Sequence, residues 1–218
     1  MFNFSCHSLQ DSPAQRILSA AMDAADPSDA IRVAITLRAD WIASARRVFL
    51  LSVGKAGIQM AEAALPFLDD KLAGGLVITK HASHPTSDRV AVIEAGHPLP
   101  DTRSLEAGQR VLDLLSRLTP RDLLICLISG GASALMAAPR AGILLDDLRN
   151  VTSILLAGGA SIDELNLIRK QLDDLKGGGL ARRSAAPVLS LILSDVIGDR
   201  LDLIASGPTV PNLTTRED

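Results

Sequence analysis

Runs of consecutive apolar residues recur along this chain, each ending at or near a glycine, a serine or a charged residue. Such runs are typical of strands that are buried on both faces of a sheet. The sequence contains five of them: "RRVFLLSVG" at 46–54, "GGLVITK" at 74–80, "VAVIEAG" at 90–96, "DLLICLIS" at 122–129 and "APVLSLILSD" at 186–195. We predict a strand in each run, and we expect the last strand, like the first, to be buried.

Between these runs, apolar residues recur with the period of an α-helix. Ser12 is a suitable N-cap because Pro13 follows it at the first helical position. Ser161 and Glu164 have the spacing of a capping box. We predict helices over residues 12–26, 28–39, 56–68, 101–118, 145–156 and 161–175.

Strands that alternate with amphipathic helices are typical of a mainly parallel sheet with helices on both faces and right-handed crossovers. The sequence therefore predicts one α/β domain over residues 1–218, a three-layer α/β/α sandwich with a mostly parallel, doubly wound, Rossmann-like sheet. A chain of 218 residues can bury a core large enough to be stable without disulfides or metals.

Composition excludes several classes of partner. The net charge is −3, and there is no long run of either sign to attract a phosphate backbone. Aromatic residues make up 2% of the chain, so there is no platform on which bases could stack. The longest uncharged stretch, 123–139, contains serines and glycines and is short for a membrane span. We expect neither nucleic acid nor membrane as a partner.

The two cysteines indicate a reducing compartment. Cys6 and Cys126 have no zinc or redox spacing, and Cys126 lies within an apolar run. We expect Cys126 to be a buried thiol and Cys6 a thiol in the N-terminal tail. The N-terminus also lacks a basic region followed by an apolar stretch, so we expect a cytoplasmic protein.

In doubly wound sheets, ligands bind beyond the carboxyl ends of the strands, so the loops after the strands are the candidate site. The first loop holds Gly54 and Lys55 just before a helix, where an anion is favoured. It is not a GxxxxGK[ST] loop, because Phe49 and Ala56 occupy the positions of the first glycine and the hydroxyl residue. A surface lysine after a turn is the alternative.

The second loop places two glycines between serines. Its residues are Ser129, Gly130, Gly131, Ala132 and Ser133. Such a loop can present successive N–H groups to an anion. The serine-hydrolase pattern GxSxG fails, since Leu135 stands at its last glycine. A glycine kink that lets a strand and a helix pack closely is the alternative.

The third loop begins with an aspartate. Asp195 follows the last apolar run, where its carboxylate can act as a general base or a magnesium ligand. The nearby "SGPT", with Ser206 and Gly207, offers a further turn whose backbone N–H groups we expect to be free. A helix-capping aspartate is the alternative.

The helix predicted over 161–175 adds a polar stripe. At about 100° per residue, Asn166, Arg169 and Asp173 fall on one face of that helix. The planar guanidinium of Arg169 suits a carboxylate or a phosphate. A solvated helix face is the alternative.

The histidines do not form a recognisable metal site. His81 and His84 have HxxH spacing, and His97 lies in "GHPLPD". No cysteine or third ligand follows at a zinc spacing, so we interpret all three as loop histidines.

Taken together, the loop motifs resemble those of a known family. They are "VGKA", "GHPLPD", "LISGGASALMAAP", "LNLIRKQLDDLKGGGLA" and "LILSDVIGDRLDLIASGPTVPN". Their order and spacing resemble the N-terminal domain of the class II glycerate 2-kinases, some relatives of which carry the label hydroxypyruvate reductase. The resemblance extends from about residue 17 to the C-terminus, and the last two motifs are specific.

The resemblance implies transfer of the γ-phosphoryl group of Mg-ATP to the 2-hydroxyl of D-glycerate. ATP and Mg²⁺ would be the cofactors, and glycerate the small-molecule substrate. Lys55 matches a lysine thought to meet the substrate or the transferring phosphate, and Asp195 matches a strand-end aspartate cast as base or magnesium partner. The expected roles are catalysis by Lys55, Arg169 and Asp195, substrate binding by Ser129, Gly130, Gly131, Ala132, Ser133 and Asn166, and nucleotide binding by Gly54, Ser206 and Gly207.

The sequence departs from the family pattern at several positions. Gln171 replaces a usual histidine, Asp173 falls near a usual small residue, and Gly179 extends the usual glycine pair. Family members also continue after "SGPTVP" into a C-terminal domain, whereas this chain ends at Asp218. We therefore expect a truncated, folded chain with weak binding and little turnover, whose exposed apolar surface promotes self-association.

Two other functions stay open. A nicotinamide-dependent hydroxypyruvate reductase would need GxGxxG after a strand and an acidic residue some twenty positions later, and the sequence has no such combination. A non-catalytic anion-binding fragment is the second alternative.

Overall fold

A five-stranded parallel sheet forms the centre of the protein. The computed structural model describes residues 12–68, 70–82 and 87–214, so Cys6 and His84 lie outside the described residues. The strands are β1 (Val48–Val53), β2 (Leu72–Thr79), β3 (Val90–Glu94), β4 (Leu123–Ile128) and β5 (Val188–Ile192). They lie in the order β3-β2-β1-β4-β5, and every neighbouring pair is parallel.

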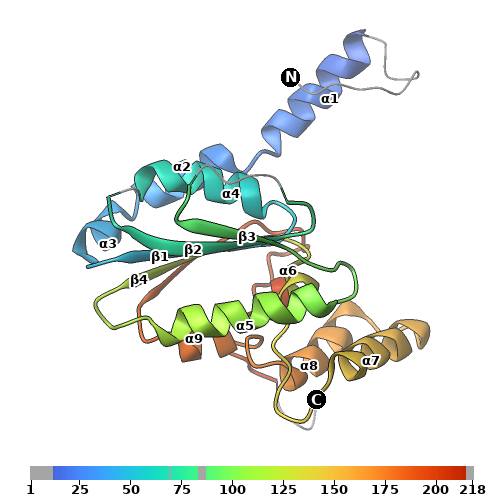
Figure 1. Ribbon diagram of the computed structural model, residues 1–218. Helices are drawn as coiled ribbons and strands as arrows, with labels where there is room; N and C mark the ends of the chain where they lie inside the picture. The colour runs from blue at the N-terminus through green and yellow to red at the C-terminus, as the bar shows by residue number, and fades with distance from the viewer. Residues whose placement is uncertain (1–11, 69, 83–86, 215–218) are drawn as a thin grey trace.

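Helices cover both faces of the sheet. Figure 1 shows α2 and α4 on one face and α5 and α9 on the other. The helices are α1 (Ser12–Ala24), α2 (Ser28–Thr36), α3 (Ala39–Ser44), α4 (Gly57–Ala64), α5 (Thr102–Ser116), α6 (Ala132–Leu135), α7 (Leu145–Ala157), α8 (Ile162–Leu172) and α9 (Gly179–Arg183), with the 3-10 turns η2 (Leu65–Phe67) and η3 (Ile204–Ser206). The predicted three-layer, doubly wound α/β fold is confirmed. No helix in the described ranges is long and apolar enough to cross a membrane.

The core consists of aliphatic side chains on both sides of the central strands. Every residue of β1 and β4 is buried, as expected for strands covered on both faces. Cys126 lies within β4 and is buried as predicted, and this burial raises the pKa of its thiol to about 12. The central strands therefore form a rigid base for the loops at their carboxyl ends.

Several predicted elements differ in extent. The helix predicted over 28–39 ends at Thr36 as α2, and α3, which begins at Ala39, was not predicted. The helix predicted over 56–68 ends in the turn η2, since Pro66 lacks the N–H that an α-helix needs. The helix predicted over 161–175 ends at Leu172, and Asp173 already has extended backbone angles. The short elements α6, α9 and η3 were not predicted.

The last strand is less buried than predicted. Each residue of β5 is only half-buried. Its run of apolar residues resembles that of β1, but β5 lies at the edge of the sheet and pairs with β4 alone among the described strands. An apolar run indicates a strand but does not tell where in the sheet the strand lies.

Two adjacent glycines in β2 provide a test of this packing. A Cβ atom on Gly75 would lie 2.8 Å from the carbonyl oxygen of Leu50 in β1, whereas one on Gly74 would meet nothing closer than 3.8 Å. We expect Gly75→Ala to lower the free energy of unfolding by about 1–3 kcal/mol through overpacking. Gly74→Ala is the matched control and should change it by no more than about 0.5 kcal/mol. Urea denaturation measures both, and equal losses would contradict the packing described for β1 and β2.

Candidate functional site

A cleft lies at the carboxyl edge of the sheet, where the strand order reverses between β1 and β4. Connections after these two strands leave in opposite directions, which opens a crevice between them. The cleft has a volume of about 950 Å³ and is bordered by the loops after β1, β3, β4 and β5 and by α7 and α8. Of the residues predicted from sequence, it is lined by Lys55, Gly130, Gly131, Ser133, Asn166, Arg169 and Asp195.

The loops after β1 and β4 are held together by direct contact. Gly54 has a φ of 131°, and a Cβ atom there would overlap the hydroxyl oxygen of Ser129 and lie 2.6 Å from its carbonyl oxygen. The N–H of Ala56 donates to the Ser129 hydroxyl at 3.1 Å, and the N–H of Lys55 donates to the Gly130 carbonyl at 3.0 Å. Gly54 and the 2%-exposed Ser129 therefore join the two loops and do not line the cleft.

Two glycines form the floor of the cleft, and side chains from three loops lie against them. A Cβ atom on Gly130 would overlap the carboxylate of Asp195. One on Gly131, whose φ is 90°, would lie 3.0 Å from the His97 ring and 3.4 Å from Cε of Lys55. Neither glycine N–H donates a hydrogen bond to any described residue. Only residues without side chains leave room for these groups to converge.

The cationic side chains of the cleft lack counterions. Within the described ranges, neither Lys55 nor Arg169 makes a side-chain hydrogen bond or an ion pair. Burial lowers the pKa of the Arg169 guanidinium, which still stays charged at neutral pH. Asp195 likewise has no hydrogen-bond or ion-pair partner among the described residues. Arg169 is partly buried and Lys55 is exposed, and two neighbouring cations without counterions favour an anionic ligand.

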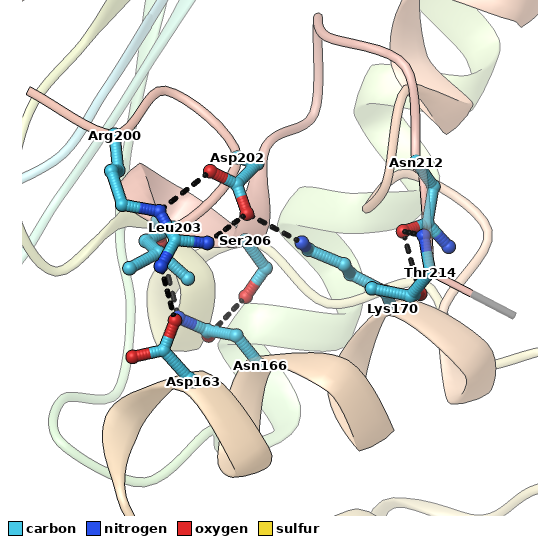
Figure 2. Close-up of polar contacts among 9 residues, drawn as sticks. All are labelled: Asp163, Asn166, Lys170, Arg200, Asp202, Leu203, Ser206, Asn212 and Thr214. Carbon is cyan, nitrogen blue, oxygen red and sulfur yellow. Dashed lines mark hydrogen bonds and ion pairs between the residues drawn. The ribbon is translucent and has the colours of Figure 1, made fainter. Parts of the chain in front are cut away.

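Asn166 belongs to a hydrogen-bonded wall behind the cleft. Its amide nitrogen donates to the Leu203 carbonyl at 3.2 Å, and the Ser206 hydroxyl donates to its amide oxygen at 2.7 Å (Figure 2). The Ser133 hydroxyl lies 2.8 Å from that of Ser206. Ser206 is completely buried, so it links α6 and α8 rather than lining the cleft.

The expectation of free N–H groups in "SGPT" was wrong. The N–H of Ser206 donates to Leu203 and that of Gly207 to Ile204, which closes the turn η3. The carbonyls of Ser206 and Gly207 accept from the N–H groups of Gly177 and Gly178. Neither Gly207 nor Ala132 lines the cleft.

Asp173 does not lie on the polar stripe predicted for it. Because α8 ends at Leu172, the Asp173 side chain turns into the interior, where it forms an ion pair of 2.6 Å with Lys176. The exposed fractions of these side chains are 1% and 5%. Asp173 also accepts from the N–H groups of Ala138 and Leu175, so it fixes the backbone that follows α8.

Sequence reasoning also missed a group of ion pairs at the mouth of the cleft. Arg200 pairs with Asp163 at 2.8 Å and with Asp202 at 3.0 Å, and Asp202 in turn lies 3.4 Å from the buried Lys170 (Figure 2). These contacts fasten the segment after Asp195 onto α8. No local pattern in the sequence indicated the pairs of Arg200 with Asp163 and of Lys170 with Asp202, because these partners are far apart along the chain.

His97 is the second omission. It was interpreted as a loop histidine, yet it lines the cleft beside Lys55 and Gly131. Burial, together with the charges of Lys55, Lys80 and Arg169, lowers the pKa of its imidazole. Its position directly after β3, at the same edge of the sheet, was the signal that could have identified it.

Apolar side chains surround the mouth of this polar cleft. Ile197 is 99% exposed, and Leu156, Ile162 and Leu99 are exposed to lesser degrees. They come from different elements, so the rim is a composite surface.

Fold and site together define an α/β protein with a cleft that contains Lys55 and Arg169 at the switch point of a doubly wound sheet. The chain belongs to the family described as "Domain of unknown function (DUF4147)", whose model matches residues 13–218. It is 46% identical over 175 residues to a D-glycerate 2-kinase of Thermotoga maritima, covering 79% of this chain and 42% of that one.

Other relatives carry related names. A putative hydroxypyruvate reductase of Agrobacterium vitis is 45% identical over 173 residues, covering 79% of this chain and 45% of that one. The crystal structure of a glycerate kinase from Thermotoga maritima has a TM-score of 0.79 and 40% identity, and the similarity covers 93% of this chain and 50% of that chain. The chain thus spans about half the length of the relatives it matches. The resemblance to the glycerate 2-kinases stated from the sequence is confirmed.

The ion pair behind the cleft can be tested by substitution. Asp173→Asn would leave Lys176 charged and buried without a counterion, so we expect a loss of about 3–5 kcal/mol in the free energy of unfolding. Asp163→Asn, which breaks the exposed pair with Arg200, is the control and should leave that free energy nearly unchanged. Urea denaturation compares the two, and a stable Asp173→Asn variant would refute the assigned role.

Proposed function

We propose that this chain forms the anion-binding part of a glycerate 2-kinase, which transfers the γ-phosphoryl group of ATP to the 2-hydroxyl of D-glycerate. The observation that carries the proposal is the convergence of Lys55, Arg169 and Asp195, none with a described partner, over a glycine floor. Phosphoryl transfer requires positioned cations around the phosphates and an acceptor for one proton, and it requires no covalent nucleophile.

The side chains suit the two anionic reactants. Arg169 can bind a carboxylate or a phosphate with two parallel hydrogen bonds, whereas Lys55 provides a single mobile charge. The N–H groups of Gly130 and Gly131 can add further hydrogen bonds to an oxyanion. Ser133 and Asn166 line the same cleft and can contact the substrate. The other predicted residues, Gly54, Ser129, Ala132, Ser206 and Gly207, do not line it and would support the loops behind the floor.

The residues present also fit a magnesium ion in the way nucleotide sites hold it. The described residues contain no cluster of three or more His, Cys, Asp or Glu that could hold a metal ion. Magnesium in such sites needs only one or two carboxylates, since phosphate oxygens and water complete its shell. Asp195 would supply a carboxylate, and the bound ion would neutralise charge on the phosphates.

A reductase is the competing function, because some relatives are named putative hydroxypyruvate reductases. Hydride transfer would require a site for a dinucleotide, and no strand is followed by GxGxxG. Glycerate-dependent formation of ADP and hydroxypyruvate-dependent loss of NADH distinguish the two activities in coupled assays. A chain that binds anions and catalyses neither reaction would be the non-catalytic alternative.

Exposed apolar side chains at the mouth of the cleft offer a surface on which another part of a functional enzyme can pack. The relatives are about twice as long as this chain. We infer that another surface covers the apolar rim during the reaction. Calorimetric titration with ADP, Mg²⁺ and D-glycerate therefore accompanies the activity assay, because binding can be measured where turnover is low.

Lys55→Ala and Asp195→Ala test the proposal. We expect each to reduce kcat/KM for glycerate-dependent ADP formation by about 10²–10³-fold, as for the loss of one transition-state contact. Arg117→Ala and Asp113→Ala are controls of matched charge, in a groove at the opposite edge of the sheet, and should leave activity unchanged. Equal activity in all four variants would remove Lys55 and Asp195 from the mechanism.

A further inference from the structure

The imidazole of His97 lies in the cleft, against the floor glycine Gly131. A Cβ atom on Gly131 would lie 3.0 Å from its Cδ2 and 3.2 Å from its Nε2, and 3.4 Å from Cε of Lys55. The ring and the lysine side chain therefore approach the same point from the loops after β3 and β1. In the described part of the chain, His97 makes no side-chain hydrogen bond or ion pair, so its Nε2 beside Gly131 has no partner that a ligand would have to displace.

The charges that face His97 are mostly positive. Lys55 faces it from the loop after β1, Lys80 from the loop after β2 and Arg169 from α8. One negative charge lies nearby, because the carboxylate of Asp195 packs against the neighbouring glycine, Gly130. Burial and the three cations hold the pKa of His97 below its ordinary value, so at neutral pH the ring carries one unprotonated nitrogen.

A neutral base has an advantage at this position. It accepts a proton without adding negative charge beside the phosphates that the cations attract. Bound phosphate also neutralises Lys55 and Arg169, which makes the protonated imidazole easier to form as the reaction proceeds. Asp195 is then left to hold a magnesium ion.

We propose that His97 is a further catalytic residue of this cleft, whose unprotonated imidazole takes the proton of the acceptor hydroxyl. This role rests on the proposed kinase function. As the hydroxyl oxygen forms its bond to the γ-phosphorus, the bond from that phosphorus to the β-phosphate oxygen breaks and ADP leaves with the electron pair. The hydroxyl proton passes to His97 and from there to solvent.

The first test needs no turnover. NMR titration of the histidine ring protons, assigned with His97→Gln, gives the pKa of His97 with and without inorganic phosphate as the probe. We expect the pKa of His97 to rise when phosphate binds, while the ring resonances of the exposed His81 do not respond to phosphate. A His97 resonance that does not respond to saturating phosphate would overturn the proposal.

The second test measures proton transfer. A base that must be unprotonated makes kcat/KM fall as the pH is lowered through its pKa, which gives the pH profile an acidic limb. We expect His97→Gln to lose this limb and to lower kcat/KM by about 10²–10⁴-fold. Imidazole in the buffer should partly restore the rate of His97→Ala, a rescue that a purely structural role would not produce. His81→Gln is the matched control and should keep the wild-type profile.

The outcomes separate the two proposals. An active protein in which His97→Gln keeps the acidic limb overturns the role of His97 and leaves the kinase function standing. A wild-type protein that binds neither Mg-ADP nor D-glycerate in calorimetric titration, even though phosphate shifts the His97 resonance, overturns the kinase function and with it the role of His97 as a base.

Discussion

The candidate site depends on one close contact, that between the loops that follow β1 and β4. The absence of a side chain at Gly54 allows the hydroxyl of Ser129 to lie against the backbone and to accept from the N–H of Ala56. With the bond from Lys55 to the Gly130 carbonyl, this contact fixes where one loop begins its helix and where the other exposes its glycines. β1 and β4 are adjacent and fully buried, so both loops start from a rigid base.

From this contact follows an arrangement in which cationic side chains lie close together without counterions. The fold brings Lys55 and Arg169 to one cleft and gives neither of them a counterion among the described residues. Elsewhere the chain pairs its buried charges: Lys176 with Asp173 and Lys170 with Asp202. Unpaired cations in the cleft beside paired cations behind it indicate that the missing anion is supplied from outside, by a substrate or a nucleotide.

The apolar runs predicted the strands and the fold class because a buried parallel strand must be apolar on both faces. Local chemistry also predicted the capping box of Ser161 and Glu164. The pattern could not predict the partial exposure of β5, since its place at the edge depends on pairing and not on its own residues. It placed Asp173 on a helix face because periodicity does not show where a helix ends.

The residues of the site that directly follow strands could be predicted from the apolar runs. Lys55, Gly130 and Asp195 follow strands, and parallel strands bring their carboxyl ends to one edge of the sheet. Other contacts of the site join residues distant in sequence: Asp195 lies against Gly130, Ala56 donates to Ser129, and Arg200 pairs with Asp163. Such contacts depend on how the loops pack, which no local pattern records.

The most direct measurement is a crystal structure of this chain with D-glycerate, ADP and magnesium. Our account predicts that an anionic group of a ligand lies over Gly130 and Gly131, within hydrogen-bond reach of Lys55 and Arg169. A ligand bound instead in the groove at the opposite edge of the sheet, beside Arg110 and Arg117, with the cleft empty, would contradict it.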